Sequence, residues 1–149
     1  MRCVVQRSGQ ARVDIDGRTA GAIERGLVVL AAFAADDTER ELAWMAAKLP
    51  DLRVFNDEQG RMNLSLRDTG GGILLVSQFT LYGNCRKGNR PSFVDSAPPD
   101  EARVLYERFG RLLRARWPEV AEGRFGADMK VSLLNDGPVT LIIDREASR

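Results

Sequence analysis

Two short, uninterrupted apolar runs constrain the fold of this 149-residue chain more than any other feature. They are residues 27–33 (LVVLAAF) and 73–76 (ILLV). Both are too short for a typical helix, and neither alternates with polar residues. Strands of this kind are buried on both faces, as in the centre of a sheet that is covered by other layers. The sequence therefore predicts a sheet with apolar packing on both sides.

Two further segments have the apolar spacing of helices. Residues 38–50 begin at a threonine that can cap a helix, place apolar residues at i, i+3, i+4 and i+7, and end at a proline. Residues 98–118 begin and end at prolines and keep helical spacing between them. Other strands are predicted at residues 3–7, 11–15, 52–55, 62–66, 129–134 and 139–143. The pattern predicts one α+β (mixed α/β) domain over residues 1–149, with curved or barrel-like sheets and two long helices packed on one side.

The absence of histidine limits the chemistry of any active site. Neither a Ser-His-Asp or Cys-His centre nor a histidine-bound zinc can be assembled from this sequence. We therefore expect no metal and no other cofactor. Cys3 and Cys85 lack the spacing of a metal or redox motif and are predicted to be free thiols. The first residues contain no sustained apolar run, so we expect a cytoplasmic protein with no membrane segment.

Polar side chains follow the second apolar run directly, in the stretch VSQFTLYG (residues 76–83). In a regular strand Ser77 and Thr80 would face opposite sides, so the chain must bend if both belong to one pocket. One interpretation is a strand that simply leaves the core at its wet end. The other is a functional site at the end of a buried strand.

The stretch NDGP (residues 135–138) separates two predicted strands and also has two interpretations. Local turn chemistry favours a hairpin turn. Proline, however, cannot donate a hydrogen bond to the strand that should follow. Gly137 allows close backbone approach, and Pro138 leaves two carbonyl groups free to face a ligand.

Positive charge is concentrated in residues 84–118. This segment holds eight Lys and Arg residues and four Asp and Glu residues, a net +4 against +1 for the whole chain. Such charges commonly lie on a solvated helix face. They also fit a surface that faces phosphate groups.

Both unusual stretches resemble signatures of the bacterial and eukaryotic D-aminoacyl-tRNA deacylases. The family motifs SQxTL and NxGPVT match residues 77–81 and 135–140. The likeness extends over essentially the whole chain, and it includes segments within residues 4–13, 55–64, 90–93 and 123–129.

The resemblance implies a homodimer that hydrolyses the ester between a D-amino acid and tRNA, with glycine as a second candidate substrate. It also implies that the Gly137-Pro138 bond is cis and enters the pocket of the partner subunit, where its carbonyls hold the substrate's α-amino group. The alternatives are a hydrolase of another small acyl ester and a non-catalytic tRNA- or RNA-binding module.

The candidate site residues have different expected roles. Thr80 would be a poor nucleophile because no base in the motif accepts its proton. We expect backbone N–H groups near Phe79 and Thr80 to polarise the ester carbonyl, and the 2′-hydroxyl of the tRNA's terminal adenosine to help activate water. The candidate catalytic residues are Ser77, Gln78, Phe79 and Thr80, the substrate-binding residues are Phe125, Met129, Gly137 and Pro138, and the tRNA contacts are Arg86, Lys87 and Arg90.

Overall fold

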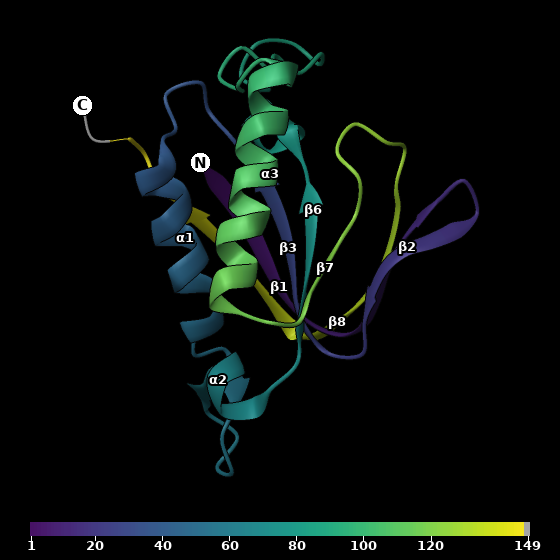
Figure 1. Ribbon diagram of the computed structural model, residues 1–149, viewed down its shortest axis with the longest axis vertical. Helices are drawn as coiled ribbons and strands as arrows, with labels where there is room; N and C mark the ends of the chain where they lie inside the picture. Colours follow the sequence, from purple (N-terminus) through teal and green to yellow (C-terminus); the bar gives the residue numbers. More distant parts are fainter. Residues whose placement is uncertain (148–149) are drawn as a thin grey trace.

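The long strand β1 (Arg2–Ile15) organises the sheet in the computed structural model, which describes residues 1–147 (Figure 1). Its first half pairs antiparallel with β3, and its second half pairs antiparallel with β2. Its other edge pairs antiparallel with β8 along most of its length. The sheet continues from β3 to β6 and then to β7 through parallel pairs. The bounds of these strands are β2 Arg18–Ile23, β3 Gly26–Ala32, β6 Gly72–Ser77, β7 Val120–Glu122 and β8 Lys130–Asp144.

The parallel strands β3 and β6 are buried on both faces, as the two apolar runs predicted. On one face Val29 and Leu75 belong to the main core, which lies between the sheet and the helices. On the other face Val28 and Leu74 belong to a second core, which is enclosed by the curved β1, β2 and the segment after β7. At Gly21 the backbone of β2 comes so close to β7 that an added Cβ would lie 2.6 Å from the Glu122 carbonyl oxygen. The sheet therefore curls into an almost closed barrel.

The helices α1 (Glu39–Asp51) and α3 (Pro99–Arg116) cover one face of this sheet, side by side (Figure 1). Thr38 caps α1 through a capping box with Glu41. Phe33, which directly follows β3, packs edge to face against Phe109 of α3, with 6.1 Å between the ring centroids. The predicted class, mixed α/β with a barrel-like sheet and two long helices on one side, is confirmed. Smaller elements between the helices are β4 (Phe55–Asn56), β5 (Met62–Leu64) and α2 (Leu66–Thr69).

Two pairs of neighbouring predicted strands are each one strand in the structure, so neither pair forms a hairpin. Residues 3–7 and 11–15 form the single strand β1, because Ser8 stays in the strand and its hydroxyl donates to the Leu134 carbonyl. Residues 129–134 and 139–143 are likewise parts of one element, β8, and both parts pair with β1 rather than with each other. The short elements β2, α2 and β7 were not predicted.

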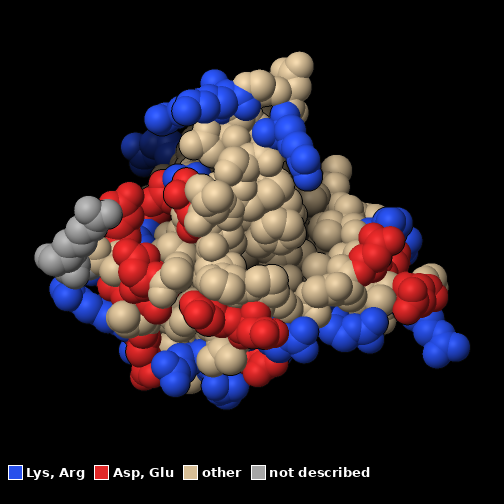
Figure 2. Space-filling view, turned by 90° about the horizontal axis from the view of Figure 1, so that it is seen from above, with Lys and Arg blue, Asp and Glu red and all other residues tan. Residues whose placement is uncertain are grey.

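Charged side chains surround an uncharged central area at the end of the molecule seen in Figure 2. Lys and Arg groups border this area at the top of the view and again along its lower edge, and Asp and Glu groups lie to its left, below it and to its right. No helix within residues 1–147 is long and apolar enough to cross a membrane. Cys3 is buried and Cys85 is exposed, and both are free thiols as predicted.

Candidate active site

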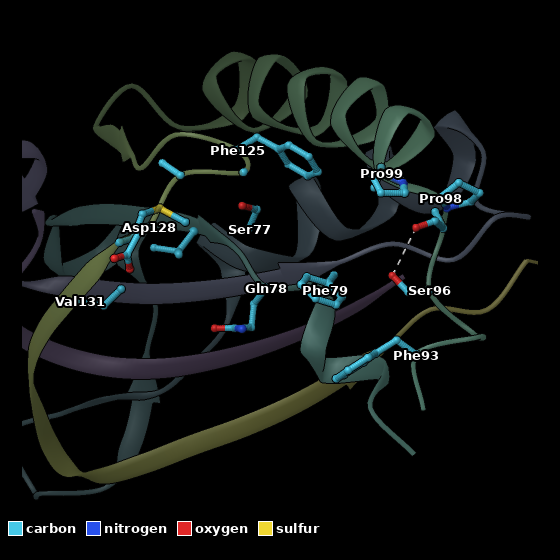
Figure 3. Close-up of a pocket in the computed structure, with 16 residues that line it drawn as sticks. Ser77, Gln78, Phe79, Phe93, Ser96, Pro98, Pro99, Phe125, Asp128 and Val131 are labelled. Carbon is cyan, nitrogen blue, oxygen red and sulfur yellow. Dashed lines mark hydrogen bonds between the residues drawn. The ribbon is translucent and has the colours of Figure 1, made fainter. Parts of the chain in front are cut away.

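A pocket of about 640 Å³ lies at the carboxyl end of β6, next to the start of α3 (Figure 3). Three segments that are distant in sequence form its walls: the strand end and the turn after it, the entry to α3, and the connection from β7 to β8. Such a position, beyond the carboxyl ends of parallel strands, is a common place for ligand sites. The lining residues named in Figure 3 are Ser77, Gln78, Phe79, Phe93, Ser96, Pro98, Pro99, Phe125, Asp128 and Val131.

The chain bends sharply where β6 ends. Ser77 is the last residue of β6, and Gln78 then adopts φ −147° and ψ 73° before the 3₁₀ turn η1 (Phe79–Tyr82) begins. The Gln78 backbone N–H donates to the Ala31 carbonyl oxygen at 2.8 Å, which ties the bend to β3. Its side-chain amide donates to the hydroxyl of Thr80. The predicted bend is therefore present, and it turns Ser77, Gln78 and Phe79 toward one pocket.

Two backbone N–H groups at the start of η1 have no acceptor within residues 1–147. They belong to Phe79 and Thr80, and they lack a partner because the first N–H groups of a helical turn precede its own carbonyls. The next N–H group, that of Leu81, already bonds to the Gln78 carbonyl oxygen at 3.2 Å. The free pair beside the pocket can donate to a ligand oxygen.

Phe125 and Met129 also line the pocket, and both come from the connection between β7 and β8. The Phe125 ring lies 5.8 Å from the Tyr106 ring and 5.6 Å from the guanidinium carbon of Arg103. The Tyr106 hydroxyl donates to the Leu75 carbonyl at 3.3 Å. Burial, followed by the nearby Glu122 carboxylate, raises the pKa of the Tyr106 phenol. Tyr106 therefore supports the wall as a neutral phenol and cannot serve as a base near neutral pH.

The stretch around Gly137 and Pro138 is a loop extruded from β8, which excludes the hairpin turn. The β1–β8 register passes from Gln6 opposite Thr140 to Ser8 opposite Asn135, so a short step on β1 faces a longer stretch of β8. The Gly137-Pro138 peptide bond is cis, as the family resemblance implied. Both residues are exposed, and neither lines the pocket of its own chain.

The Asn135 side chain bridges the base of this loop. Its carbonyl oxygen accepts from the Val139 N–H at 2.8 Å, and its amide nitrogen donates to the Thr140 hydroxyl at 3.0 Å. The asparagine thus replaces ladder hydrogen bonds that the loop interrupts. This explains why the motif joins an asparagine to the Gly-Pro pair.

Arg7 supports this loop through a hydrogen bond to its backbone. It was not predicted as a site residue. Its guanidinium is almost buried, and it donates to the carbonyl oxygens of Asp136 at 2.6 Å and Val54 at 2.7 Å. It also donates to the Asn56 side chain at 3.1 Å. The Asp136 carboxylate also lies 4.0 Å from the Arg7 Nε atom. A nearly buried guanidinium with these acceptors holds the three segments in fixed positions relative to one another. The sequence did not distinguish Arg7, because β1 carries several other charged and polar residues.

The structure therefore brings only part of the predicted site together. Ser77, Gln78 and Phe79 line one side of the pocket, and Phe125 and Met129 line the other. Thr80 is exposed, does not line the pocket and is attached to it through Gln78. Phe93 and the two prolines at the start of α3 were missed as lining residues. Phe93 packs against Phe79 at 5.1 Å between ring centroids. The predicted tRNA contacts Arg86, Lys87 and Arg90 lie exposed in the loop that precedes Phe93.

Residues 1–147 contain no cluster of three or more Cys, Asp or Glu side chains that could hold a metal ion. The pocket is lined by one carboxylate, that of Asp128, which is exposed and accepts from the Lys130 ammonium group at 3.0 and 3.1 Å. The arrangement can thus donate backbone and side-chain hydrogen bonds to a neutral or anionic group. It presents no base of its own that is free of a charged partner.

Known proteins similar to this chain point to one family. Residues 4–144 match the model of the family described as D-Tyr-tRNA(Tyr) deacylase. The D-aminoacyl-tRNA deacylase of Geobacter sulfurreducens is 55% identical over 147 residues, which cover 99% of this chain and 97% of the relative. That of Thermotoga petrophila is 54% identical over 144 residues and 97% of each chain.

Two solved structures have the same fold. One, titled c-Myc DNA Unwinding Element Binding Protein, superposes with a TM-score of 0.92 at 41% identity and covers 99% of this chain and 100% of its own. The other, titled as a probable eukaryotic D-amino acid tRNA deacylase, gives a TM-score of 0.84 at 21% identity over 97% of this chain and 98% of its own. The family match and the curated relatives extend over nearly the full length and include both motif regions. This chain therefore belongs to the D-Tyr-tRNA(Tyr) deacylase family.

Proposed function

We propose that this protein hydrolyses the ester bond between a D-amino acid and tRNA. It thereby removes D-amino acids from wrongly charged tRNAs before these take part in translation. The observation that carries the proposal is the pair of free N–H groups at Phe79 and Thr80, which adjoin a pocket large enough to hold an amino acid. An ester carbonyl placed there would be polarised as its oxygen becomes negative. Family membership supports the same reaction.

The chemistry requires positioning more than a strong base. An aminoacyl ester is already activated, and holding it against fixed donors supplies much of the rate. Thr80 is bound to the Gln78 amide and has no base to take its proton, so it does not act as the nucleophile. Water attacks the carbonyl instead, with the neighbouring 2′-hydroxyl of the terminal adenosine helping to activate it. Ser77 and Gln78 shape the pocket beside the reacting group.

Selection of the D-form requires acceptors for the substrate's α-ammonium group. The pocket of one chain lacks an unpaired carboxylate for this purpose, whereas Gly137 and Pro138 are exposed outside it. We therefore propose a homodimer in which this loop enters the pocket of the partner. The exposed apolar side chains Leu134 and Ile142, on the same strand as the loop, support contact with a second copy.

The exposed loop that precedes Phe93 and holds Arg86, Lys87 and Arg90 is the proposed first contact for the tRNA. Reversing the charges of Arg86, Lys87 and Arg90 should raise KM for aminoacyl-tRNA and make its dependence on salt less steep, because fewer counterions are released on binding. Protein stability should change little, since all three side chains are exposed. Steady-state kinetics at several salt concentrations test this. An unchanged salt dependence would place the RNA elsewhere.

Turnover of matched D- and L-aminoacyl-tRNAs tests the function itself. We expect the D-ester to be cleaved at least about a hundredfold faster, because a rigid pocket rejects the other enantiomer by clash and lost contacts. Simple D-amino acid esters serve as a control. Equal cleavage of both hands would indicate a general acyl-esterase, and tight tRNA binding without any turnover would indicate the RNA-binding alternative.

Three variants separate the backbone donors from the side chains. Thr80→Ala and Phe79→Ala keep both N–H groups, and each should lower kcat by less than about tenfold, the cost of one lost contact. Phe79→Pro removes one donor at the first position of a turn, where proline is tolerated, and should lower kcat by about 10²- to 10³-fold. Single-turnover kinetics measure these effects. An ester of the D-amino acid trapped on Thr80 of the wild-type protein would overturn the mechanism.

Mixed dimers test the contribution of the loop. Ser77→Phe blocks the pocket, Pro138→Glu disables the loop, and each variant alone should be inactive while remaining a dimer by light scattering. If the loop acts in the partner's pocket, heterodimers regain one working site, and co-refolded mixtures recover about a quarter of wild-type activity under two-fold symmetry. If instead the loop serves its own chain, the mixture remains inactive.

A further inference from the structure

Arg103 places a positive charge at the rim of the pocket. It lies in the first turns of α3, it is exposed, and its guanidinium carbon is 5.6 Å from the centre of the Phe125 ring. Phe125 lines the pocket and is supported from another side by Tyr106 at 5.8 Å. Figure 3 shows Phe125 beside α3, across the pocket from Phe79. The Arg103 guanidinium therefore lies over an aromatic ring that Tyr106 supports, across the pocket from the turn that carries the free N–H groups.

The charge of Arg103 is not neutralised, in contrast to those of Arg108 and Arg114 on the same helix. Arg111 and Arg116 of this helix also have no ion pair within residues 1–147. Arg108 pairs with Glu39 at 3.6 Å, and Arg114 pairs with Glu122 at 2.6 Å. Within residues 1–147, no carboxylate lies within ion-pair distance of Arg103. A guanidinium without a carboxylate partner keeps N–H groups available, and their planar fork fits the oxygens of a phosphate.

We propose that Arg103 binds the phosphate on the 5′ side of the esterified terminal nucleotide. The inference rests on the proposed function, in which the amino acid occupies the pocket and the carbonyl oxygen of the ester accepts hydrogen bonds from the N–H groups of Phe79 and Thr80. The nucleoside then lies at the mouth of the pocket, and this phosphate is the anion nearest to the ester in every tRNA. Arg103 thus recognises a feature that all substrates share, so it contributes to binding without selecting among tRNAs.

Two minimal substrates isolate this contact. A D-aminoacyl ester of adenosine lacks the phosphate, whereas the same ester of the trinucleotide CCA carries it. For wild-type protein, kcat/KM should be higher for the trinucleotide ester. In Arg103→Gln, the ratio of the two kcat/KM values should fall about tenfold, the usual effect of one charge-assisted hydrogen bond. Arg103→Lys keeps a charge and should restore part of the ratio.

Arg108→Gln is the matched control, since it removes an exposed, paired arginine from the same helix and should leave the ratio unchanged. The inference is wrong if Arg103→Gln has the wild-type ratio, or if it lowers kcat/KM equally for both esters. The second result would mean that Arg103 only supports the Phe125 wall. A wild-type protein that cleaves neither D-ester, nor a full D-aminoacyl-tRNA, would instead refute the proposed function.

Discussion

The parallel pairing of β3 with β6 is the constraint on which the rest of the structure depends. Because these strands are apolar on both faces, the helices must cover one face and the curled sheet must cover the other. A strand enclosed in this way can carry polar residues only after it leaves the core. Ser77 marks that point on β6, and the bend at Gln78 is fixed by its bond to Ala31 at the end of β3. The position of the pocket is thus a consequence of how the core is buried.

A second constraint is the change of register between β1 and β8. An extruded loop would normally be mobile, but here the Asn135 side chain closes its base and Arg7 holds it from below. The Arg7 guanidinium is nearly buried, so its hydrogen bonds act in a medium that screens them weakly. The same cation reaches Val54, which links the loop to the segment that follows α1. Rigid support of this kind suits the proposed role of the loop, in which its backbone carbonyls face the substrate in one orientation.

The sequence was sufficient for the features that depend on local patterns. Apolar runs identified β3 and β6, and helical spacing identified α1 and α3, because each pattern reports the burial of its own segment. It failed where pairing was decided by distant residues. The strands flanking residues 135–138 both prefer β1 to each other, and alternation alone cannot reveal such a choice of partner. Arg7 was missed for the same reason, since its acceptors are 47 and 129 residues away in the sequence.

The distribution of polar groups explains how a chain without histidine or a metal cluster in its described part can discriminate between enantiomers. The pocket side supplies hydrogen-bond donors, and the only carboxylate that lines it, Asp128, is held by Lys130. Gly137 and Pro138 are exposed outside that pocket, and in the proposed homodimer their carbonyls are the acceptors for the α-ammonium group. Neutral carbonyls bind an ammonium group more weakly than a buried carboxylate would, which favours release of the free amino acid. In the proposed homodimer, donors and acceptors belong to separate rigid elements, so a substrate is held for reaction when its ester and its amino group match both directions.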